Sequence, residues 1–244
     1  MELIKLDATA STNTFLKNLA SNTLLSNFTV VTTESQHDGR GQMGAKWVSE
    51  PSKNLLFSVY FRHDNFSVND GFFLSMSAAL AAYKVLISYE IPKLSVKWPN
   101  DIMSGNKKIG GFLIENSIKK NKVQHSIIGL GLNVNQKNFG VDLPYASSLS
   151  NELGQDLDKN ILLDLLLNEL QKEFKNCINS KFTSLKTRYL AVLYKFQIPT
   201  MFKDKSDSVF MGKIIDITIE GLLKVMLVDE SIALFDLKEV RFVH

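Results

Sequence analysis

Apolar and polar positions along the chain alternate between a strand-like and a helix-like pattern. Residues 28–33 and 54–61 are rich in β-branched and other apolar side chains, which is typical of strands. Apolar side chains between residues 68 and 88 recur every three or four positions, which predicts a helix with one buried face. Further strands are predicted at 94–98, 107–115 and 123–134, and further helices at 159–178 and 181–194.

The two later strands, 107–115 and 123–134, flank the polar segment ENSIKKNK, which predicts a hairpin. The middle of the chain is therefore mixed, and we expect helices to cover one side of a sheet. After about residue 194 the pattern changes to short β-rich runs with no helix between them, which is typical of a barrel of ~50 residues. The predicted fold class is α+β, with a mixed sheet and packed helices over 1–194 and a small C-terminal β-barrel over 195–244.

The composition is that of an ordinary globular protein. Of the 244 residues, 45% are hydrophobic and 22% are charged, and a chain of this length can bury a core without disulfides or metals. The single cysteine, Cys177, excludes an internal disulfide and a zinc site built from cysteines. The four histidines are scattered, which argues against a His-rich metal centre; they are His37, His63, His125 and His244.

Charge and hydropathy exclude several classes of protein. The net charge of +3 is too small to indicate a nucleic-acid binder. No stretch approaches the ~18 consecutive apolar residues that span a bilayer, and the N-terminus MELIKLDATASTN lacks the apolar run of a signal peptide. We therefore expect a cytoplasmic protein that binds no membrane.

The placement of glycines gives the first indication of chemistry. Eight of the 13 glycines fall into three short stretches, namely Gly39, Gly41 and Gly44, then Gly105, Gly110 and Gly111, and finally Gly129 and Gly131. Glycine lets a ligand approach the backbone, although a glycine pair alone more often marks a turn or a bulge. Polar or cationic neighbours in each stretch favour a ligand site.

Two segments carry charge beside these glycines. In the segment 36–47, backbone N–H groups can form an anion-binding concavity to which Arg40, one of only four arginines, adds charge-assisted bonds. Its sequence GRGQMG is neither a P-loop nor a Rossmann fingerprint. In the segment KWPND, Lys97 beside Asn100 and Asp101 suits an anionic ligand, whereas the alternative is a solvated lysine followed by a turn.

The three segments GRGQMGAKWVSEPSKNLLFSVYF, KWPNDIMSGNKKIGGFLIE and IGLGLNVN resemble, in this order, the motifs of biotin protein ligases. The upstream residues Ser11, Thr12 and Asn13 match the N-terminal biotin-contacting element of that family, and they are also typical of a helix N-cap. The β-rich tail is similar to the SH3-like domain of the family. The resemblance implies a class II synthetase-like catalytic domain followed by that small barrel.

The resemblance also implies roles for individual residues. The implied biotin-binding residues are Ser11, Thr12, Asn13, Gln36, Arg40, Gly41, Gln42, Lys108, Gly110, Gly111, Gly129 and Gly131. The implied ATP-binding residues are Arg40, Trp47, Lys97, Asn100, Asp101 and Asn133, and Asp101 could act through Mg²⁺. Lys97 and Arg40 are the implied catalytic residues, because they match cations that meet the biotin carboxylate and the α-phosphate.

The implied substrates are biotin and MgATP, and the implied partner is the biotin carboxyl carrier domain of a carboxylase. Biotin would be activated as biotinyl-5′-AMP and then transferred to a lysine of that domain. Lipoate ligases also activate their acid substrate as an adenylate, but they lack the KWPND and GRG pattern. They are one alternative. A non-catalytic binder of biotin or nucleotide is a second alternative, and a transcriptional regulator is a third.

The chain departs from the family pattern in two respects. Many members carry a more arginine-rich loop, GRGRRGR, where this chain has Gln42, Met43 and Ala45. The Ser-Thr-Asn element starts at residue 11, so we expect no winged-helix domain before it and no specific DNA binding. The sequence leaves open whether Arg241 reaches the nucleotide and what the oligomeric state is, a homodimer included. Glycines and few apolar anchors predict that the loop 37–46 is mobile without ligand.

Overall fold

The computed structural model describes residues 1–179 and 182–243. Residue 181 of the predicted helix 181–194 and His244 therefore lie outside the described residues. In chain order the helices and strands are β1 (Glu2–Thr9), α1 (Thr12–Asn22), β2 (Thr29–Gln36), β3 (Leu55–Ser67), α2 (Gly71–Ile87), β4 (Leu94–Lys97), β5 (Asp101–Ser104), β6 (Lys107–Lys119), β7 (Lys122–Leu132), α3 (Leu149–Leu153), α4 (Lys159–Asn179), α5 (Phe182–Ala191), β8 (Pro199–Asp204), β9 (Val209–Ile217), β10 (Leu223–Leu227), β11 (Ile232–Phe235) and β12 (Val240–Phe242).

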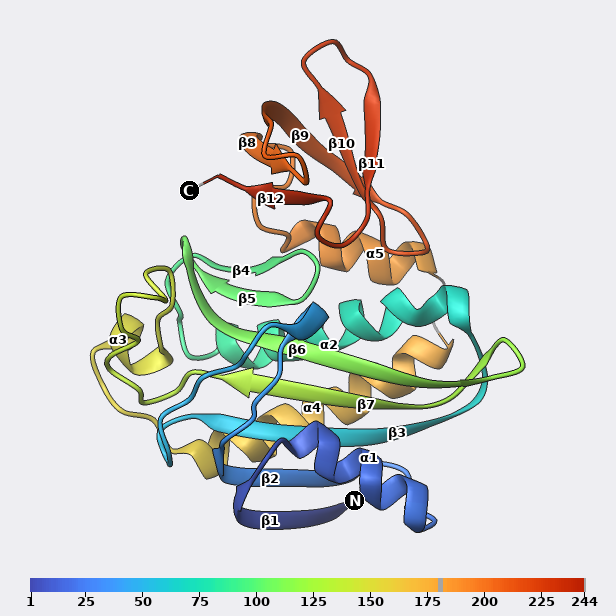
Figure 1. Ribbon diagram of the computed structural model, residues 1–244, viewed down its shortest axis with the longest axis vertical. Helices are drawn as coiled ribbons and strands as arrows, with labels where there is room; N and C mark the ends of the chain where they lie inside the picture. The colour runs from blue at the N-terminus through green and yellow to red at the C-terminus, as the bar shows by residue number, and fades with distance from the viewer. Residues whose placement is uncertain (180–181, 244) are drawn as a thin grey trace.

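The larger sheet has seven strands in the order β1-β2-β3-β7-β6-β5-β4 (Figure 1). β1 and β2 are parallel and every other neighbouring pair is antiparallel. Successive residues of the central strands face opposite sides, as strand geometry requires. Val30 and Ile128 belong to the main hydrophobic core, whereas their chain neighbours Val31 and Ile127 belong to a second, smaller cluster on the other face.

Helices cover both faces of this sheet, and not one face as the sequence pattern predicts. α2 and α4 pack against each other and contribute to the main core with residues such as Leu74, Leu86 and Leu170 (Figure 1). α1 lies on the opposite face, where Leu16 is fully buried against Val31. α1 covers only part of that face, and the candidate site lies beside it. No helix among the described residues is long and apolar enough to cross a membrane.

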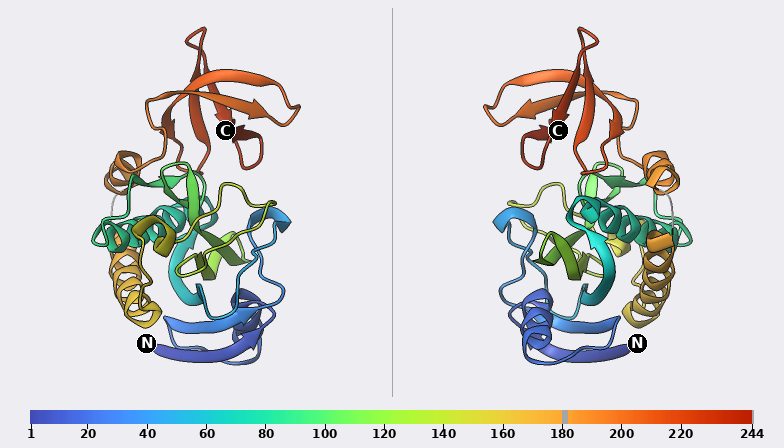
Figure 2. Two further views of the ribbon diagram at one scale, coloured as in Figure 1. Left: turned by 90° about the vertical axis from the view of Figure 1, so that its left-hand side faces the viewer. Right: turned by 90° about the vertical axis from the view of Figure 1, so that its right-hand side faces the viewer.

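The C-terminal strands form a separate antiparallel sheet in the order β11-β10-β9-β8-β12. It stands at one end of the molecule beyond β4, β5 and α5, far from β1 at the other end (Figure 2). Its buried residues, such as Phe202 and Val225, are continuous with the main core. The arrangement matches the predicted small β-rich C-terminal unit, and the division at residue 194 stays a prediction.

Several local predictions need correction. Most of ENSIKKNK is strand, because the β6–β7 hairpin turns only at Lys120 and Asn121, which both adopt positive φ. β3 continues to Ser67 and α5 ends at Ala191. The sequence pattern does not predict β1 or the four-residue β5.

Candidate active site

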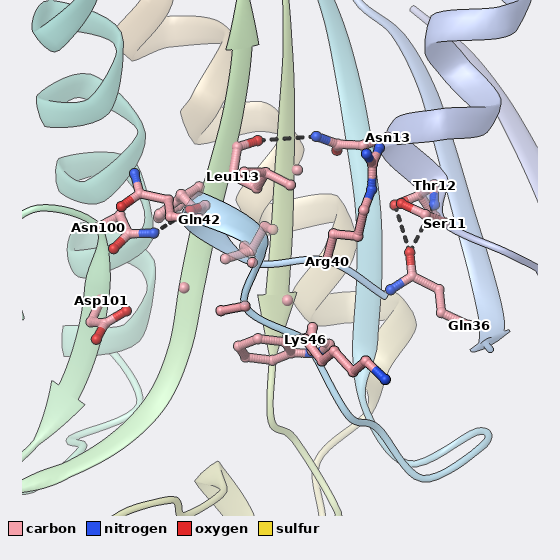
Figure 3. Close-up of a pocket in the computed structure, with 18 of the residues that line it drawn as sticks. Ser11, Thr12, Asn13, Gln36, Arg40, Gln42, Lys46, Asn100, Asp101 and Leu113 are labelled. Carbon is pink, nitrogen blue, oxygen red and sulfur yellow. Dashed lines mark hydrogen bonds between the residues drawn. The ribbon is translucent and has the colours of Figure 1, made fainter. Parts of the chain in front are cut away.

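A cavity of about 220 Å³ lies on the face of the sheet beside α1 (Figure 3). It gathers most of the predicted site residues from separate segments: Ser11, Thr12, Asn13, Gln36, Arg40, Gly41, Gln42, Trp47, Asn100, Asp101, Lys108, Gly111, Gly129 and Gly131. Ala45, Lys46, Phe57, Phe112, Leu113 and Leu130 complete its lining. Three predicted residues do not line it, and they are Lys97, Gly110 and Asn133. This cavity is called the first cavity below.

One end of the first cavity carries neutral hydrogen-bonding groups. The backbone N–H and the hydroxyl of Thr12 both donate to Gln36 Oε1, at 2.7 and 3.1 Å. Ser58 Oγ lies 2.7 Å from Thr12 Oγ1 and 2.6 Å from Asn13 Oδ1. Ser11 occupies the N-cap position of α1, but its side chain accepts no cap hydrogen bond from the described residues. These contacts hold a row of amides and hydroxyls in fixed positions.

Asn13 is fixed from a second direction by β6. Its Nδ2 donates to the carbonyl of Leu113 at 3.2 Å and to Glu115 Oε2 at 2.9 Å. A Cβ added to Gly129 would lie 2.2 Å from Asn13 Oδ1, so the missing side chain makes room for Asn13. Because the amide is bound on both sides, it presents one orientation to a ligand.

The opposite end of the cavity carries charge, and Figure 3 places Asn100 and Asp101 there, across from Thr12 and Gln36. Lys108 Nζ forms an ion pair with Asp101 Oδ1 at 2.6 Å. The same ammonium lies 5.6 Å from the ring centre of Trp47, within range of a cation–π attraction. Asn100 Nδ2 donates to the carbonyl of Phe112, which fixes this amide against β6.

Trp47 forms a wall of the cavity. A Cβ added to Gly131 would lie 2.5 Å from the Trp47 ring, so the indole packs directly on the backbone of β7. Its Nε1 is buried and has no hydrogen-bond partner among the residues described. A buried donor without a partner is unfavourable, and a ligand acceptor would relieve that cost.

The loop 37–46 closes the cavity from the front as a small hairpin. The backbone N–H of Gly41 donates to Ala45 O at 2.7 Å, and that of Trp47 donates to Gly39 O at 2.9 Å. Arg40 Nη2 donates to Thr14 Oγ1 at 2.7 Å and lies 3.6 Å from Glu115 Oε2. The guanidinium is therefore anchored to α1 and β6 at the rim of the cavity.

Lys97 lines a second cavity of about 700 Å³, which lies between the β4–β5 turn and the C-terminal sheet. The two cavities adjoin, because Gln42 and Asp101 line both. Burial lowers the pKa of Lys97 and the charge of Lys108 adds to that effect, whereas Asp101 opposes it. The β4–β5 hairpin pairs Lys97 with Asp101, so the chain does turn at Pro99.

Gly110 and Asn133 lie outside the lining of the first cavity. A Cβ on Gly110 would lie 2.9 Å from Leu132 Cδ1, so this glycine serves the packing of β6 on β7. The side chain of Asn133 donates to Ser147 O at 2.9 Å. Asn133 lines a small cavity of about 100 Å³ that shares Trp47, Lys46 and Lys108 with the first cavity.

The described residues contain no group of three or more His, Cys, Asp or Glu side chains that could hold a metal ion. Asp101 is a single carboxylate already paired with Lys108. Mg²⁺ commonly binds through one or two carboxylates together with substrate phosphates. Asp101 fits that mode and does not fit a metal cage made by the protein alone.

Sequence reasoning did not single out Ser58 or Glu115. Ser58 lies in a predicted strand whose neighbours Phe57 and Val59 are apolar, and a polar residue between buried ones is a signal of a polar contact. Glu115 lies two residues after Leu113 on β6, so the strand period places both side chains on the same face. The partners of both residues come from α1, which no local pattern reveals.

The chain is similar in sequence and in fold to known ligases. The family model described as biotin/lipoate A/B protein ligase matches residues 6–133, and the chain belongs to that family. The chain is 30% identical over 225 residues to the bifunctional ligase/repressor BirA of Bacillus spizizenii, covering 91% of this chain and 68% of that protein.

Two further proteins are similar to this chain. A biotin–[acetyl-CoA-carboxylase] ligase of Paracoccus denitrificans is 33% identical over 164 residues, covering 65% of this chain and 67% of that protein. The solved structure of a biotin protein ligase from Aquifex aeolicus in complex with biotin and ATP superimposes with a TM-score of 0.80 at 25% identity, covering 99% of each chain.

Proposed function

We propose that this chain is a biotin protein ligase. It uses ATP to activate biotin as biotinyl-5′-AMP and transfers biotin to a lysine of the biotin carboxyl carrier domain of a biotin-dependent carboxylase. The observation that carries the proposal is the first cavity, which has the hydroxyl and amide groups of Thr12, Asn13 and Gln36 at one end and the Lys108–Asp101 ion pair at the other, with Arg40 at its rim. A small ligand with a neutral polar ring and a terminal carboxylate fits that polarity.

The neutral end binds the ureido ring of biotin. The Gln36 amide N–H groups and the Ser11 hydroxyl can donate to a carbonyl, and the Thr12 and Asn13 side-chain oxygens can accept from N–H groups. Leu113 supplies apolar surface for the remainder of the ring system and the chain, whereas the side chains of Phe57 and Leu130 belong to the main core on the other face of the sheet. The biotin carboxylate then points toward Lys108 and the neighbouring second cavity.

Nucleotide binds beside Lys108 and Asp101, where the first cavity adjoins both the second cavity and the small cavity lined by Asn133. The carboxylate oxygen of biotin attacks the α-phosphorus of ATP, the bond to the β-phosphate oxygen breaks, and biotinyl-5′-AMP and pyrophosphate form. Lys97, Lys108 and Arg40 neutralise the charge of the two reacting anions, which is an electrostatic and positioning role with no enzyme nucleophile. Trp47 and Asn133 bind the adenosine. Asp101 would hold the Mg²⁺ that accompanies ATP, and that ion would neutralise phosphate charge.

In the second step the neutral amine of an acceptor lysine attacks the acyl carbon of the anhydride, AMP leaves with the electrons of the broken C–O bond, and the new amide nitrogen releases one proton to solvent. The second cavity is the larger opening beside Lys97 and provides a route for that side chain. The cytoplasmic location and the absence of specific DNA binding stay predictions, and the oligomeric state stays open. An electrophoretic shift with operator-like DNA and a sedimentation measurement test the last two.

One experiment separates this function from its alternatives. Purified protein is given biotin or lipoate with α-labelled ATP, with and without a carrier domain. We expect labelled biotinyl-AMP with biotin alone and loss of that product, with release of AMP, when the carrier domain is added. A lipoate ligase would respond to lipoate instead, and a passive binder would form no adenylate with either acid. Either result would overturn the proposal.

A further inference from the structure

The C-terminal sheet contacts the β4–β5 turn through Trp98. Trp98 Nε1 donates to the carbonyl of Gly221 at 2.9 Å, and both atoms are buried. Gly221 has a φ of +96° and a Cβ there would lie 2.6 Å from the ring of Phe72 on α2. The β9–β10 turn is therefore seated between α2 and Trp98. This contact fixes the C-terminal sheet relative to the strand that carries Lys97.

A second contact reaches Lys97 itself. Lys97 Nζ lies 4.8 Å from the ring centre of Phe242 on β12, within the distance at which an ammonium is attracted to an aromatic face. Phe242 is held in turn by two other rings, Tyr194 at 5.5 Å and Phe202 at 5.1 Å. Because Phe202 is fully buried, the ring that faces Lys97 has little freedom to move.

We propose that Phe242 is a positioning residue, which holds the Lys97 ammonium in the second cavity, on the strand pair that also carries the junction residue Asp101. This inference rests on the proposed function, in which Lys97 neutralises the reacting anions. A lysine side chain has four rotatable bonds and a strongly hydrated head group, so a fixed partner is needed to keep it in one place. The C-terminal sheet supplies one such partner through Phe242 and keeps the distance constant through Trp98 and Gly221.

The chain offers a matched control for this contact. Phe235 on β11 belongs to the same sheet and stacks on Phe210 at 5.5 Å, but it does not line the second cavity. Phe235→Leu is the same substitution in the same sheet. It therefore measures how the loss of one aromatic ring from this sheet affects activity when the contact with Lys97 is kept. Phe242→Leu removes the ring face while leaving apolar volume, and Phe242→Tyr restores a ring.

The kinetic test measures biotin-dependent pyrophosphate release at saturating ATP. Phe242→Leu should lower kcat about 3- to 30-fold, the range that a cation–π contact implies, with the KM for biotin nearly unchanged. Phe242→Tyr should recover most of that loss, and Phe235→Leu should stay within about twofold of wild type. In a Lys97→Met background, Phe242→Leu should have no further effect, because the partner is already absent. Equal losses from Phe242→Leu with and without Lys97 would overturn the inference.

A second readout does not depend on activity. An amine-modifying reagent is added in limiting amount, and mass spectrometry locates the modified lysines over time. Lys97 should react faster in Phe242→Leu than in wild type, whereas Phe235→Leu should leave its rate unchanged. An unchanged rate in Phe242→Leu would refute the positioning role even if the wild-type protein formed no adenylate. Absence of adenylate with an altered labelling rate would refute the proposed function alone.

Discussion

Gly129 and Asn13 come so close that any Cβ on Gly129 would lie 2.2 Å from Asn13 Oδ1. The glycine is at the centre of the sheet on β7, and the asparagine is at the start of α1, 116 positions earlier in the sequence. A glycine in the middle of a strand weakens it, so its presence there indicates a close approach by another group. Here that group is a side chain which is itself fixed by hydrogen bonds to Leu113, Glu115 and Ser58.

Replacing Gly129 by Ala should displace Asn13 from its contacts with β6. We expect the free energy of unfolding to fall by about 1–3 kcal/mol, as for other overpacked sites. Biotin affinity should fall on the order of tenfold, the value of one lost hydrogen bond. Gly71→Ala is the control, because a Cβ there would meet its nearest neighbour at an ordinary 3.5 Å. Calorimetric titration with biotin and denaturant unfolding measure both effects, and unchanged binding in Gly129→Ala would contradict the role of Asn13.

Lys97→Ala should slow adenylate formation much more than it weakens biotin binding. The biotin carboxylate and the α-phosphate repel each other, and loss of one fixed donor for the developing charge costs about 2.7–4 kcal/mol, or ~10²–10³ in rate. Biotin affinity should fall much less, because Lys97 lines the second cavity and not the first. Lys97→Arg should also be slow, since its planar head group is larger. Pyrophosphate release within about twofold of wild type in Lys97→Ala would transfer the role to Lys108 and Arg40.

Trp47→Phe tests the buried indole N–H. The substitution keeps an aromatic ring on Gly131 and removes a donor that has no partner among the described residues. If nucleotide supplies the missing acceptor, ATP binding should weaken by about 0.5–1.5 kcal/mol while the empty protein becomes no less stable. Equilibrium binding of labelled ATP with biotin present, and thermal unfolding without ligand, measure these two quantities. Equal ATP affinity in the two proteins would exclude a bond from Trp47 Nε1 to the nucleotide.

His63 is buried on β3, away from the site. Its Nε2 lies 2.8 Å from Ser126 Oγ, and that hydroxyl donates to Asn116 Oδ1 at 2.6 Å. Nε2 is then the donor, and the buried Nδ1 has no partner among the residues that the structure describes. A second proton on the ring would therefore be a buried charge without a hydrogen bond. Burial, with a smaller contribution from His125, lowers the pKa of His63 to about 4.

This lowered pKa predicts acid sensitivity. The unfolded chain takes up a proton on His63 as the pH falls below about 6.5, whereas the folded chain does so only near pH 4. The contribution of His63 to the free energy of unfolding is fully present above pH 6.5, and it falls by about 3 kcal/mol as the pH falls to 4. His63→Phe should lose less stability than wild type between pH 7.5 and 4, and the exposed His37→Gln should match wild type. Parallel losses in all three proteins, measured by urea unfolding, would contradict this prediction.

The long elements of the fold are predictable because each has a local pattern. α2, α4 and the central strands β2, β3, β6 and β7 carry sustained apolar periodicity, and the short strands of the C-terminal sheet have turns between them. β1 mixes charged and apolar residues without a regular period, and β5 has only four residues, so neither gives a clear local signal. α1 lies on the second face because Leu16 packs on Val31, which is a tertiary contact.

The residues of the site are predictable in type, but their grouping is not. Glycine clusters and charged neighbours identify the segments of Arg40, Lys108 and Gly129. Nothing local indicates that Lys97 faces a different cavity from Lys108, since that depends on the turn at Pro99 and on the position of β12. The roles of Ser58 and Glu115 are set by α1, and only the folded chain brings it to them.

The walls of the first cavity differ in how well they tolerate substitutions. Its back wall is made by β3, β6 and β7, whose other face forms the main core, so a larger residue at Gly129 or Phe57 disturbs both sides of the sheet. Its front is the loop 37–46, which closes on itself through backbone bonds between Gly41 and Ala45. Selection for a bulkier analogue of the substrate should therefore enrich substitutions in the loop, while the strands behind it retain their residues.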